Sequence, residues 1–134
     1  MSARILVIED DAASLELVRY LLAAAGHAVL TAEDGEEGLR VAVRERPALV
    51  ISDLQMPVMN GFEFLEQFRK LEGFRDVPVI AVTAFSMSGD RNRVLQAGFD
   101  GYLSKPIVPE SFARQVEAFL RPEARGARGQ TSEE

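Results

Sequence analysis

Short apolar segments alternate along the chain with longer segments in which apolar residues recur at helical spacing. The short segments, which we predict to be strands, cover residues 4–8, 28–31, 48–52, 78–82 and 101–104. The predicted helices lie near residues 12–25, 35–46, 61–71, 89–97 and 109–120. Strands that alternate with helices favour a parallel sheet covered on both faces. Segments 4–8, 48–52 and 78–82 do not alternate between apolar and polar residues, as expected for strands buried on both sides.

Capping chemistry marks the starts of several predicted helices. Asp34 is followed three residues later by Glu37, and Asn60 by Glu63, which is the spacing of a capping box. Pro109 suits the first turn of the last helix, where a missing N–H costs little. The apolar positions at helical spacing are expected to face the core: Leu15, Val18, Leu22, Phe64, Leu65, Phe68, Leu71, Phe112, Val116 and Phe119.

Composition narrows the class of protein. The chain has 134 residues, a net charge of −6 and no cysteine, so disulfides and thiolate metal sites are excluded. The acidic balance argues against direct nucleic-acid binding. No apolar run is long enough to span a membrane and the start lacks a signal peptide, so we expect a cytoplasmic protein. The single histidine, His27, is expected in a surface loop, and one histidine makes a zinc site improbable.

The end of the chain differs in character from the rest. From Arg121 onward the sequence contains no large apolar residue and cannot bury enough surface to offset the entropy of ordering. We therefore predict one domain over residues 1–121 and a flexible polar tail over residues 122–134. Nothing after Leu120 could form a DNA-binding output domain.

Polar side chains that could carry chemistry follow four of the predicted strands. Glu9 and Asp10 follow the first, Asp53 the third, Thr83 the fourth and Lys105 the fifth. The carboxyl ends of parallel strands meet at one edge of the sheet, where open α/β folds place their ligands. We therefore expect these side chains to share one site.

Gathering carboxylates in one cleft is unfavourable without compensation. Two like charges about 4 Å apart repel by roughly 4 kcal/mol at an effective dielectric constant near 20. The remedy is either a raised pKa or a bound divalent cation. With oxygen ligands alone the cation would be Mg²⁺, with Mn²⁺ as the alternative.

A metal, an ammonium and a hydroxyl around one carboxylate form a phosphoryl-binding site. Asp53 is then the candidate nucleophile, which would form an aspartyl phosphate. Each residue also has an ordinary explanation: Asp11, for example, is expected to be the N-cap of the first helix rather than a ligand, and Thr83 could simply end a strand. The combination at four strand ends favours the shared site.

The chain resembles the receiver domain of bacterial two-component response regulators over residues 3–120, most closely the stand-alone regulators of the chemotaxis type. The resemblance is carried by Ile5–Asp11 (ILVIEDD), Asp53–Gly61 (DLQMPVMNG), Val82–Ala84 (VTA) and the pair Lys105-Pro106. It implies a flavodoxin-like, doubly wound fold in which a five-stranded parallel sheet of order 2-1-3-4-5 is flanked by five helices.

The resemblance also implies roles for individual acidic residues. Asp53 would be the phosphoacceptor and a metal ligand. Asp10 would bind Mg²⁺ directly and Glu9 through a water molecule. The remaining protein ligand would be the backbone carbonyl of Gln55.

The switch implied by the resemblance involves the last two strands. Thr83 and Lys105 would contact the phosphoryl oxygens, and the Lys105–Pro106 peptide bond would be cis. Thr83 would move toward the phosphoryl group, and Tyr102 would move into the vacated space. This would remodel the surface of the fourth helix, fifth strand and fifth helix, which could bind a downstream protein or a second copy of the chain. Phe85 would shield the acyl phosphate from water and lengthen its lifetime.

The leading hypothesis is a phosphorylation-controlled switch that receives its phosphoryl group from a phosphohistidine of a sensor kinase or a phosphotransfer protein. It would catalyse its own phosphorylation and dephosphorylation but would not be an enzyme toward an external substrate. One alternative is an Mg²⁺-dependent phosphohydrolase, but such enzymes commonly need a second acid two residues after the nucleophile, where this chain has Gln55. Another is an interaction domain that is never phosphorylated, which the intact set of polar residues disfavours.

Overall fold

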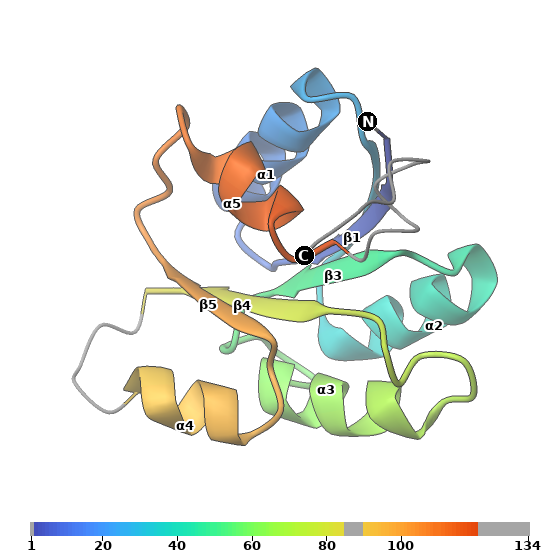
Figure 1. The fold of residues 1–134 in the computed structure, drawn as a ribbon. Helices are drawn as coiled ribbons and strands as arrows, with labels where there is room; N and C mark the ends of the chain where they lie inside the picture. The colour runs from blue at the N-terminus through green and yellow to red at the C-terminus, as the bar shows by residue number, and fades with distance from the viewer. Residues whose placement is uncertain (1, 85–89, 121–134) are drawn as a thin grey trace, which may run out of the picture.

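The computed structural model describes residues 2–84 and 90–120, and in these residues five strands alternate with five helices (Figure 1). The strands are β1 (Arg4–Ile8), β2 (Ala28–Ala32), β3 (Leu49–Ser52), β4 (Val79–Thr83) and β5 (Gly101–Ser104). The helices are α1 (Ala12–Ala24), α2 (Gly35–Glu45), α3 (Gly61–Lys70), α4 (Asp90–Gln96) and α5 (Phe112–Glu117). None of the helices in the described residues is long and apolar enough to cross a membrane. The predicted tail over 122–134 and Phe85 lie outside the described residues.

All strand pairs are parallel, and the strand order is β2-β1-β3-β4-β5. The chain thus starts inside the sheet, moves to one edge and then crosses β1 to build the other half, which defines a doubly wound fold. Figure 1 shows α1 and α5 on one face of the sheet and α2, α3 and α4 on the other. The predicted flavodoxin-like fold is confirmed.

The core lies in two layers, one on each face of the sheet. Leu6 and Ile8 of β1 belong to the layer beneath α2 and α3, whereas Ile5 and Val7 belong to the layer beneath α1 and α5. This division follows from the alternation of side chains along a strand. All residues of β3 and β4 are buried, and Arg4 is the one exposed residue of β1. The continuous apolar runs in the sequence therefore correspond to strands buried on both sides.

The two predicted capping boxes differ in the structure. At α3 both halves are present: the Asn60 side chain accepts from the Glu63 N–H, and Glu63 accepts from the Asn60 N–H. At α2, Asp34 accepts from the Glu37 N–H, but the Glu37 carboxylate accepts from the Glu33 N–H instead. The capping box predicted at Asn60 is confirmed in full, whereas at Asp34 only the N-cap is confirmed.

The start predicted for the last helix is wrong. The helix begins at Phe112 rather than near Pro109, which lies in the preceding turn. The carbonyl of Val108 accepts hydrogen bonds from the N–H groups of both Ser111 and Phe112. The turn thus supplies an acceptor for these two N–H groups before the helix begins, and Pro109 lies in the turn outside the helix.

The expectation that His27 lies in a surface loop is also wrong. Its side chain is fully buried, and Nδ1 accepts a hydrogen bond from the Ala3 N–H at 3.1 Å. The other ring nitrogen, Nε2, lies 2.7 Å from Oε2 of Glu117 on α5. Since Nδ1 acts as an acceptor, Nε2 carries the proton and donates to the carboxylate. His27 therefore ties the start of β1 to α5, and no local pattern could reveal a partner 90 residues away.

We predict that His27→Ala lowers the free energy of unfolding by about 2–3 kcal/mol, because it leaves the buried Ala3 N–H without an acceptor and creates a cavity. Urea unfolding followed by circular dichroism measures the loss. The control Glu117→Gln keeps an acceptor for Nε2 and should cost less than half as much. Equal unfolding midpoints for His27→Ala and the wild type would contradict the structural role.

Candidate functional site

The carboxyl edge of the sheet collects the polar side chains that the sequence places after separate strands. Glu9 and Asp10 follow β1, Asp53 follows β3, Thr83 is the last residue of β4, and Lys105 follows β5. In the pairing of β4 with β5, the Lys105 N–H donates to the Thr83 carbonyl at 2.9 Å. The parallel register thus brings five residues from four strand ends to one place.

Backbone contacts fix the position of Asp53. Its N–H donates to the carbonyl of Ile8 at 3.0 Å, and its carbonyl accepts from the Ser52 hydroxyl at 2.7 Å. Gly61, the first residue of α3, packs so closely on the Asp53 carbonyl that a β-carbon there would overlap it. The Gly61 N–H also donates to the Leu54 carbonyl at 3.0 Å. The start of α3 therefore holds the loop that begins at Asp53.

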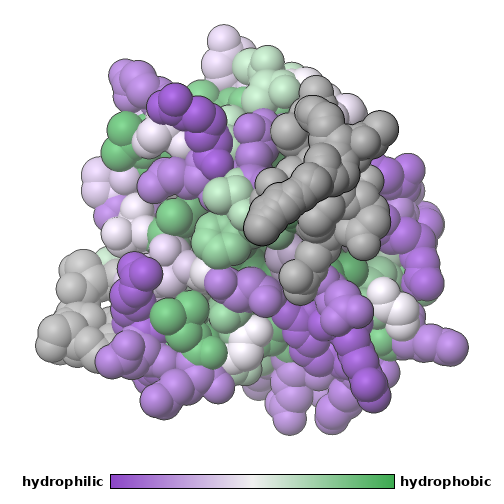
Figure 2. All heavy atoms as spheres, in the orientation of Figure 1, coloured by the Kyte–Doolittle hydropathy of each residue, from purple (hydrophilic) through white to green (hydrophobic). Residues whose placement is uncertain are grey.

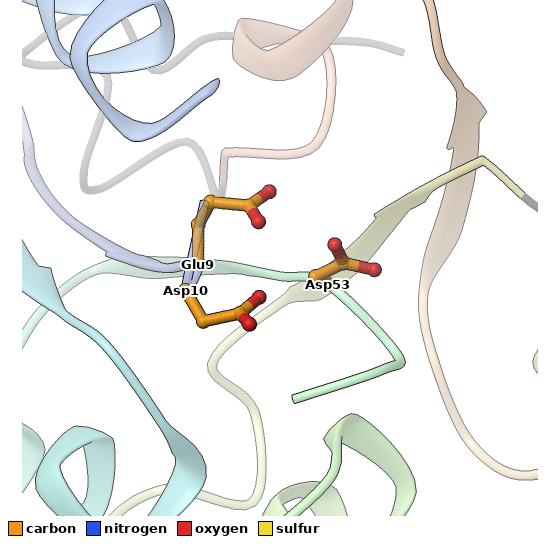
Figure 3. Close-up of side chains that lie close together, drawn as sticks. All are labelled: Glu9, Asp10 and Asp53. Atoms are coloured by element: carbon orange, nitrogen blue, oxygen red, sulfur yellow. The ribbon is translucent and has the colours of Figure 1, made fainter. Parts of the chain in front are cut away.

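Three carboxylates meet at this edge. Glu9, Asp10 and Asp53 each offer an oxygen atom, and these atoms lie within 4.8 Å of one another. Figure 3 shows Glu9 and Asp10 projecting from the end of β1 beside Asp53 at the end of β3. The side chains of Glu9 and Asp53 are only 7% and 11% exposed, whereas Asp10 lies open to solvent. An all-oxygen donor set with one solvent-facing ligand fits a hard divalent cation such as Mg²⁺ that keeps some of its waters.

Lys105 is the positive partner of two of these carboxylates. Its Nζ lies 2.8 Å from Oε1 of Glu9 and 3.1 Å from Oδ2 of Asp53. The other oxygen of Asp53, Oδ1, accepts the Leu54 N–H at 2.6 Å. Each oxygen of Asp53 thus has a donor, and one ammonium offsets part of the repulsion among three acidic groups.

Burial and the ion pair between Lys105 and the carboxylates shift the pKa values of Glu9 and Lys105. Burial raises the pKa of Glu9 above its ordinary value, and the charge of Asp53 adds to the rise, while the hydrogen bonds from Lys105 and the Asp11 N–H oppose it. For Lys105, burial acts to lower the pKa, but the hydrogen bonds to Glu9 and Asp53 outweigh it and the pKa is raised. The ion pair therefore dominates for the lysine, whereas burial dominates for the glutamate, because the glutamate is the less exposed partner.

We predict that the Glu9 carboxyl, followed by ¹³C NMR in metal-free buffer, titrates above its ordinary value of 4.5. A raised carboxyl pKa contributes stability below the unfolded pKa, and this is lost as the pH rises through the folded value. Charged Glu9 therefore opposes folding at neutral pH. Asp11 supplies an internal control of opposite sign: the Ser14 N–H lowers its pKa below 3.8. A Glu9 midpoint below 4.5 would contradict the role of burial.

The residues of the expected switch lie on neighbouring strands. Thr83 is buried, and Tyr102 is half-buried against the core layer beneath α2 and α3. Tyr102 pairs with Ala81, and Thr83 pairs with Ser104. Paired residues in a sheet share a face, and so do residues two positions apart along a strand. Thr83 and Tyr102 are therefore diagonal neighbours on the same face of the sheet.

Two further expectations concern the rim of the site. The Lys105–Pro106 bond is cis, as the resemblance implied. Asp11 is the N-cap of α1, with its side chain accepting from the Ser14 N–H at 2.9 Å, so its ordinary explanation is confirmed. The Asp11 N–H also donates to Oε2 of Glu9 at 3.1 Å, a contact that no sequence pattern indicates.

A doubly wound fold with carboxylates, a threonine and a lysine at its carboxyl edge is the arrangement expected of the receiver class of signalling proteins. The family model described as the response regulator receiver domain matches residues 5–117, and the chain belongs to this family. The family assignment made from the sequence motifs is confirmed. The chain is the receiver domain of a two-component response regulator, a family of signalling switches.

Similar proteins extend over nearly the same length. The polar-differentiation response regulator DivK of Brucella anthropi is 35% identical over 120 residues, which cover 90% of this chain and 98% of that protein. The chemotaxis protein CheY4 of Vibrio cholerae is 32% identical with a TM-score of 0.83, covering 90% of this chain and 100% of that one. The receiver domain of the sensor histidine kinase PA1611 from Pseudomonas aeruginosa is 32% identical with a TM-score of 0.80, covering 89% and 98%. That last structure has a magnesium ion coordinated in its active-site cleft.

Proposed function

We propose that Asp53 accepts a phosphoryl group from a phosphohistidine of a sensor kinase or a phosphotransfer protein. Mg²⁺ would be held by Asp10, Asp53 and the backbone carbonyl of Gln55, with Glu9 acting through a water molecule. The observation that carries the proposal is the place of Asp53, whose carboxylate belongs to the acidic cluster and whose Oδ2 lies 3.1 Å from the ammonium of Lys105. The magnesium ion in the PA1611 receiver domain supports the choice of metal.

The two oxygens of Asp53 have different roles in this proposal. Oδ1 accepts from the backbone N–H of Leu54, whereas Oδ2 accepts from the side chain of Lys105, which can turn toward an incoming phosphoryl group. We therefore assign the attack on phosphorus to Oδ2. The bond between phosphorus and the donor imidazole nitrogen breaks, and its electron pair returns to the ring. When bound, the metal ion neutralises charge on the transferring phosphoryl oxygens. Lys105 neutralises further charge, and the Thr83 hydroxyl donates a hydrogen bond to one of these oxygens.

The readout would pass from Thr83 to the surface formed by α4, β5 and α5. Thr83 moves toward the phosphoryl group, and Tyr102, its diagonal neighbour, moves into the space it leaves. Figure 2 shows hydrophobic atoms interrupting the polar surface over β5, between α4 and α5. A groove of about 640 Å³ on this face includes Tyr102, Leu103, Ile107, Phe112 and Phe119 in its lining. This surface would bind a downstream protein, with a second copy of the chain as the alternative occupant.

The chemistry of position 55 favours a switch over a hydrolase. A phosphohydrolase of the aspartyl-phosphate type would use an acid there, and the amide of Gln55 can neither protonate a leaving group nor activate water. The chain would therefore not turn over an external substrate, and we propose, as the resemblance implies, that it catalyses its own phosphorylation and dephosphorylation.

Incubation with acetyl phosphate and Mg²⁺ should add one phosphoryl group to the wild type and none to Asp53→Asn, because an amide oxygen is a poor nucleophile. Intact-protein mass spectrometry measures the increment, and peptide mapping after borohydride reduction locates it. The matched control is Asp11→Asn, which keeps a capping oxygen for α1 and should still be phosphorylated. A phosphoryl group on another residue, or one retained in Asp53→Asn, would refute the proposal.

Replacing Asp10 by asparagine removes one acidic charge and distinguishes the cost of the charge cluster to folding from its use in metal binding. In metal-free buffer at pH 7 we expect Asp10→Asn to raise the melting temperature, because it relieves repulsion with Glu9 and Asp53. Mg²⁺ at 100 times its dissociation constant should stabilise the wild type by about 2.7 kcal/mol and leave Asp10→Asn unchanged. Differential scanning calorimetry measures both effects, with the exposed Glu66→Gln as the control. Equal stabilisation of Asp10→Asn by Mg²⁺ would exclude Asp10 as a ligand.

A further inference from the structure

Asn60 and Gly61 form the single asparagine–glycine pair in the chain. Such a pair is prone to rearrange in water, because glycine has no side chain to keep its backbone nitrogen away from the asparagine amide carbon. That nitrogen gives up its proton to hydroxide and bonds to Cγ, the bond from Cγ to the amide nitrogen breaks, and ammonia leaves with a proton from water. A water molecule then opens the five-membered ring to give aspartate or isoaspartate.

Three hydrogen bonds hold this pair in a form that opposes the attack. The side-chain oxygen of Asn60 accepts from the Glu63 N–H at 2.9 Å, and the Glu63 carboxylate accepts from the Asn60 N–H at 3.0 Å. The Gly61 N–H donates to the Leu54 carbonyl at 3.0 Å, so the attacking nitrogen is itself engaged. The side chain and the nitrogen can therefore meet only when the start of α3 opens.

The backbone just before Asn60 favours that opening. The Met59 N–H donates to the Pro57 carbonyl at 2.6 Å, which closes a three-residue turn around Val58. Val58 has a φ of 68°, and a turn of this kind with a positive φ at its centre is rare and strained. A β-branched residue adds to the strain. Opening at Asn60 relieves it, so the capping contacts act against a strained neighbour.

We propose that Asn60 is a site of spontaneous modification, with water as the only co-reactant, and that the capping contact of Glu63 sets the rate. Glu63 is a positioning residue in this reaction, because it acts by keeping the start of α3 closed. Of the two products, aspartate retains an oxygen for the Glu63 N–H and places a negative charge at a helix N-terminus, where such a charge is stabilising. The aspartate form should therefore keep the fold.

The isoaspartate form should disturb the loop that begins at Asp53. In isoaspartate the backbone runs through Cβ and Cγ of residue 60, which lengthens the chain just before Gly61. Gly61 packs against the Asp53 carbonyl without room for even a β-carbon. A longer chain cannot keep both that contact and the bond from the Gly61 N–H to the Leu54 carbonyl. The loss of stability is independent of the proposed function, whereas any loss of phosphorylation rests on it.

Incubation in mildly alkaline buffer compares the wild type with Glu63→Ala and the matched control Glu63→Gln. Peptide mapping by mass spectrometry locates the exchange of the amide for a hydroxyl, and an isoaspartate methyltransferase labels the second product. Glu63→Ala should react about fivefold faster than the wild type, equivalent to about 1 kcal/mol, the net contribution of one hydrogen bond. Glu63→Gln loses the charge but keeps the acceptor, so its rate should stay within about twofold. Asn92 is followed by arginine and serves as the internal comparison.

Equal rates for Glu63→Ala and the wild type would overturn the inference. So would a wild-type rate equal to that of the chain unfolded in urea, because the fold would then give no protection. The isoaspartate form, separated by ion exchange, should unfold at lower urea concentration than Asn60→Asp, and equal midpoints would contradict its effect on the loop. A wild type that reacts as expected but takes no phosphoryl group would overturn the proposed function alone.

Discussion

Repulsion among three carboxylates at one edge of the sheet is the constraint on which the rest of the structure depends. Glu9 and Asp53 are held almost out of solvent, and Asp10 lies beside them. In isolation such a cluster would move apart or take up protons. The cluster stays together because Lys105 bridges Glu9 and Asp53 and because the backbone beneath them cannot shift. Burial raises the pKa of Glu9, and the charge of Asp53 adds a smaller part to the rise.

The backbone cannot shift because β1, β3 and β4 are buried on both faces. Each of these strands feeds apolar side chains into two core layers, so moving a strand end would disturb both layers at once. The loop that follows Asp53 carries a further cost. Val58 has a φ of 68°, a left-handed conformation that is unfavourable for a β-branched residue, and its side chain is 74% exposed. Such strain persists where the surrounding structure enforces it, here in the loop that begins at the candidate nucleophile.

The same balance of charges gives the site its capacity to respond. Three carboxylates and one lysine leave a net charge of −2, which a divalent cation would neutralise. With that cation bound, the site could accept a negatively charged phosphoryl group. In the proposed function each arrival would change the contacts of Lys105, whose Nζ lies within hydrogen-bond distance of both Glu9 and Asp53. In the same proposal, Thr83 is the residue whose movement reports the arrival of the phosphoryl group.

The sequence by itself determined the architecture and the membership of the site. Continuous apolar strands, helical spacing between them and caps such as Asn60 are local signals, and the polar residues at the strand ends follow from parallel topology alone. Local patterns failed where the outcome depends on distant partners. The last helix starts at Phe112 because a turn forms first, and His27 is buried because Glu117 on α5 reaches it.

The pairing inside the site was likewise decided only by the tertiary structure. The sequence predicted that Glu9 and Lys105 share a site for a metal ion and a phosphoryl group, but it did not indicate that they bind each other across 96 residues. That contact depends on the length of a glutamate side chain, the register of β4 against β5 and the depth of burial. Those quantities are set by packing, because a hydrogen bond forms or fails over about 1 Å and no pattern of residue types resolves that distance.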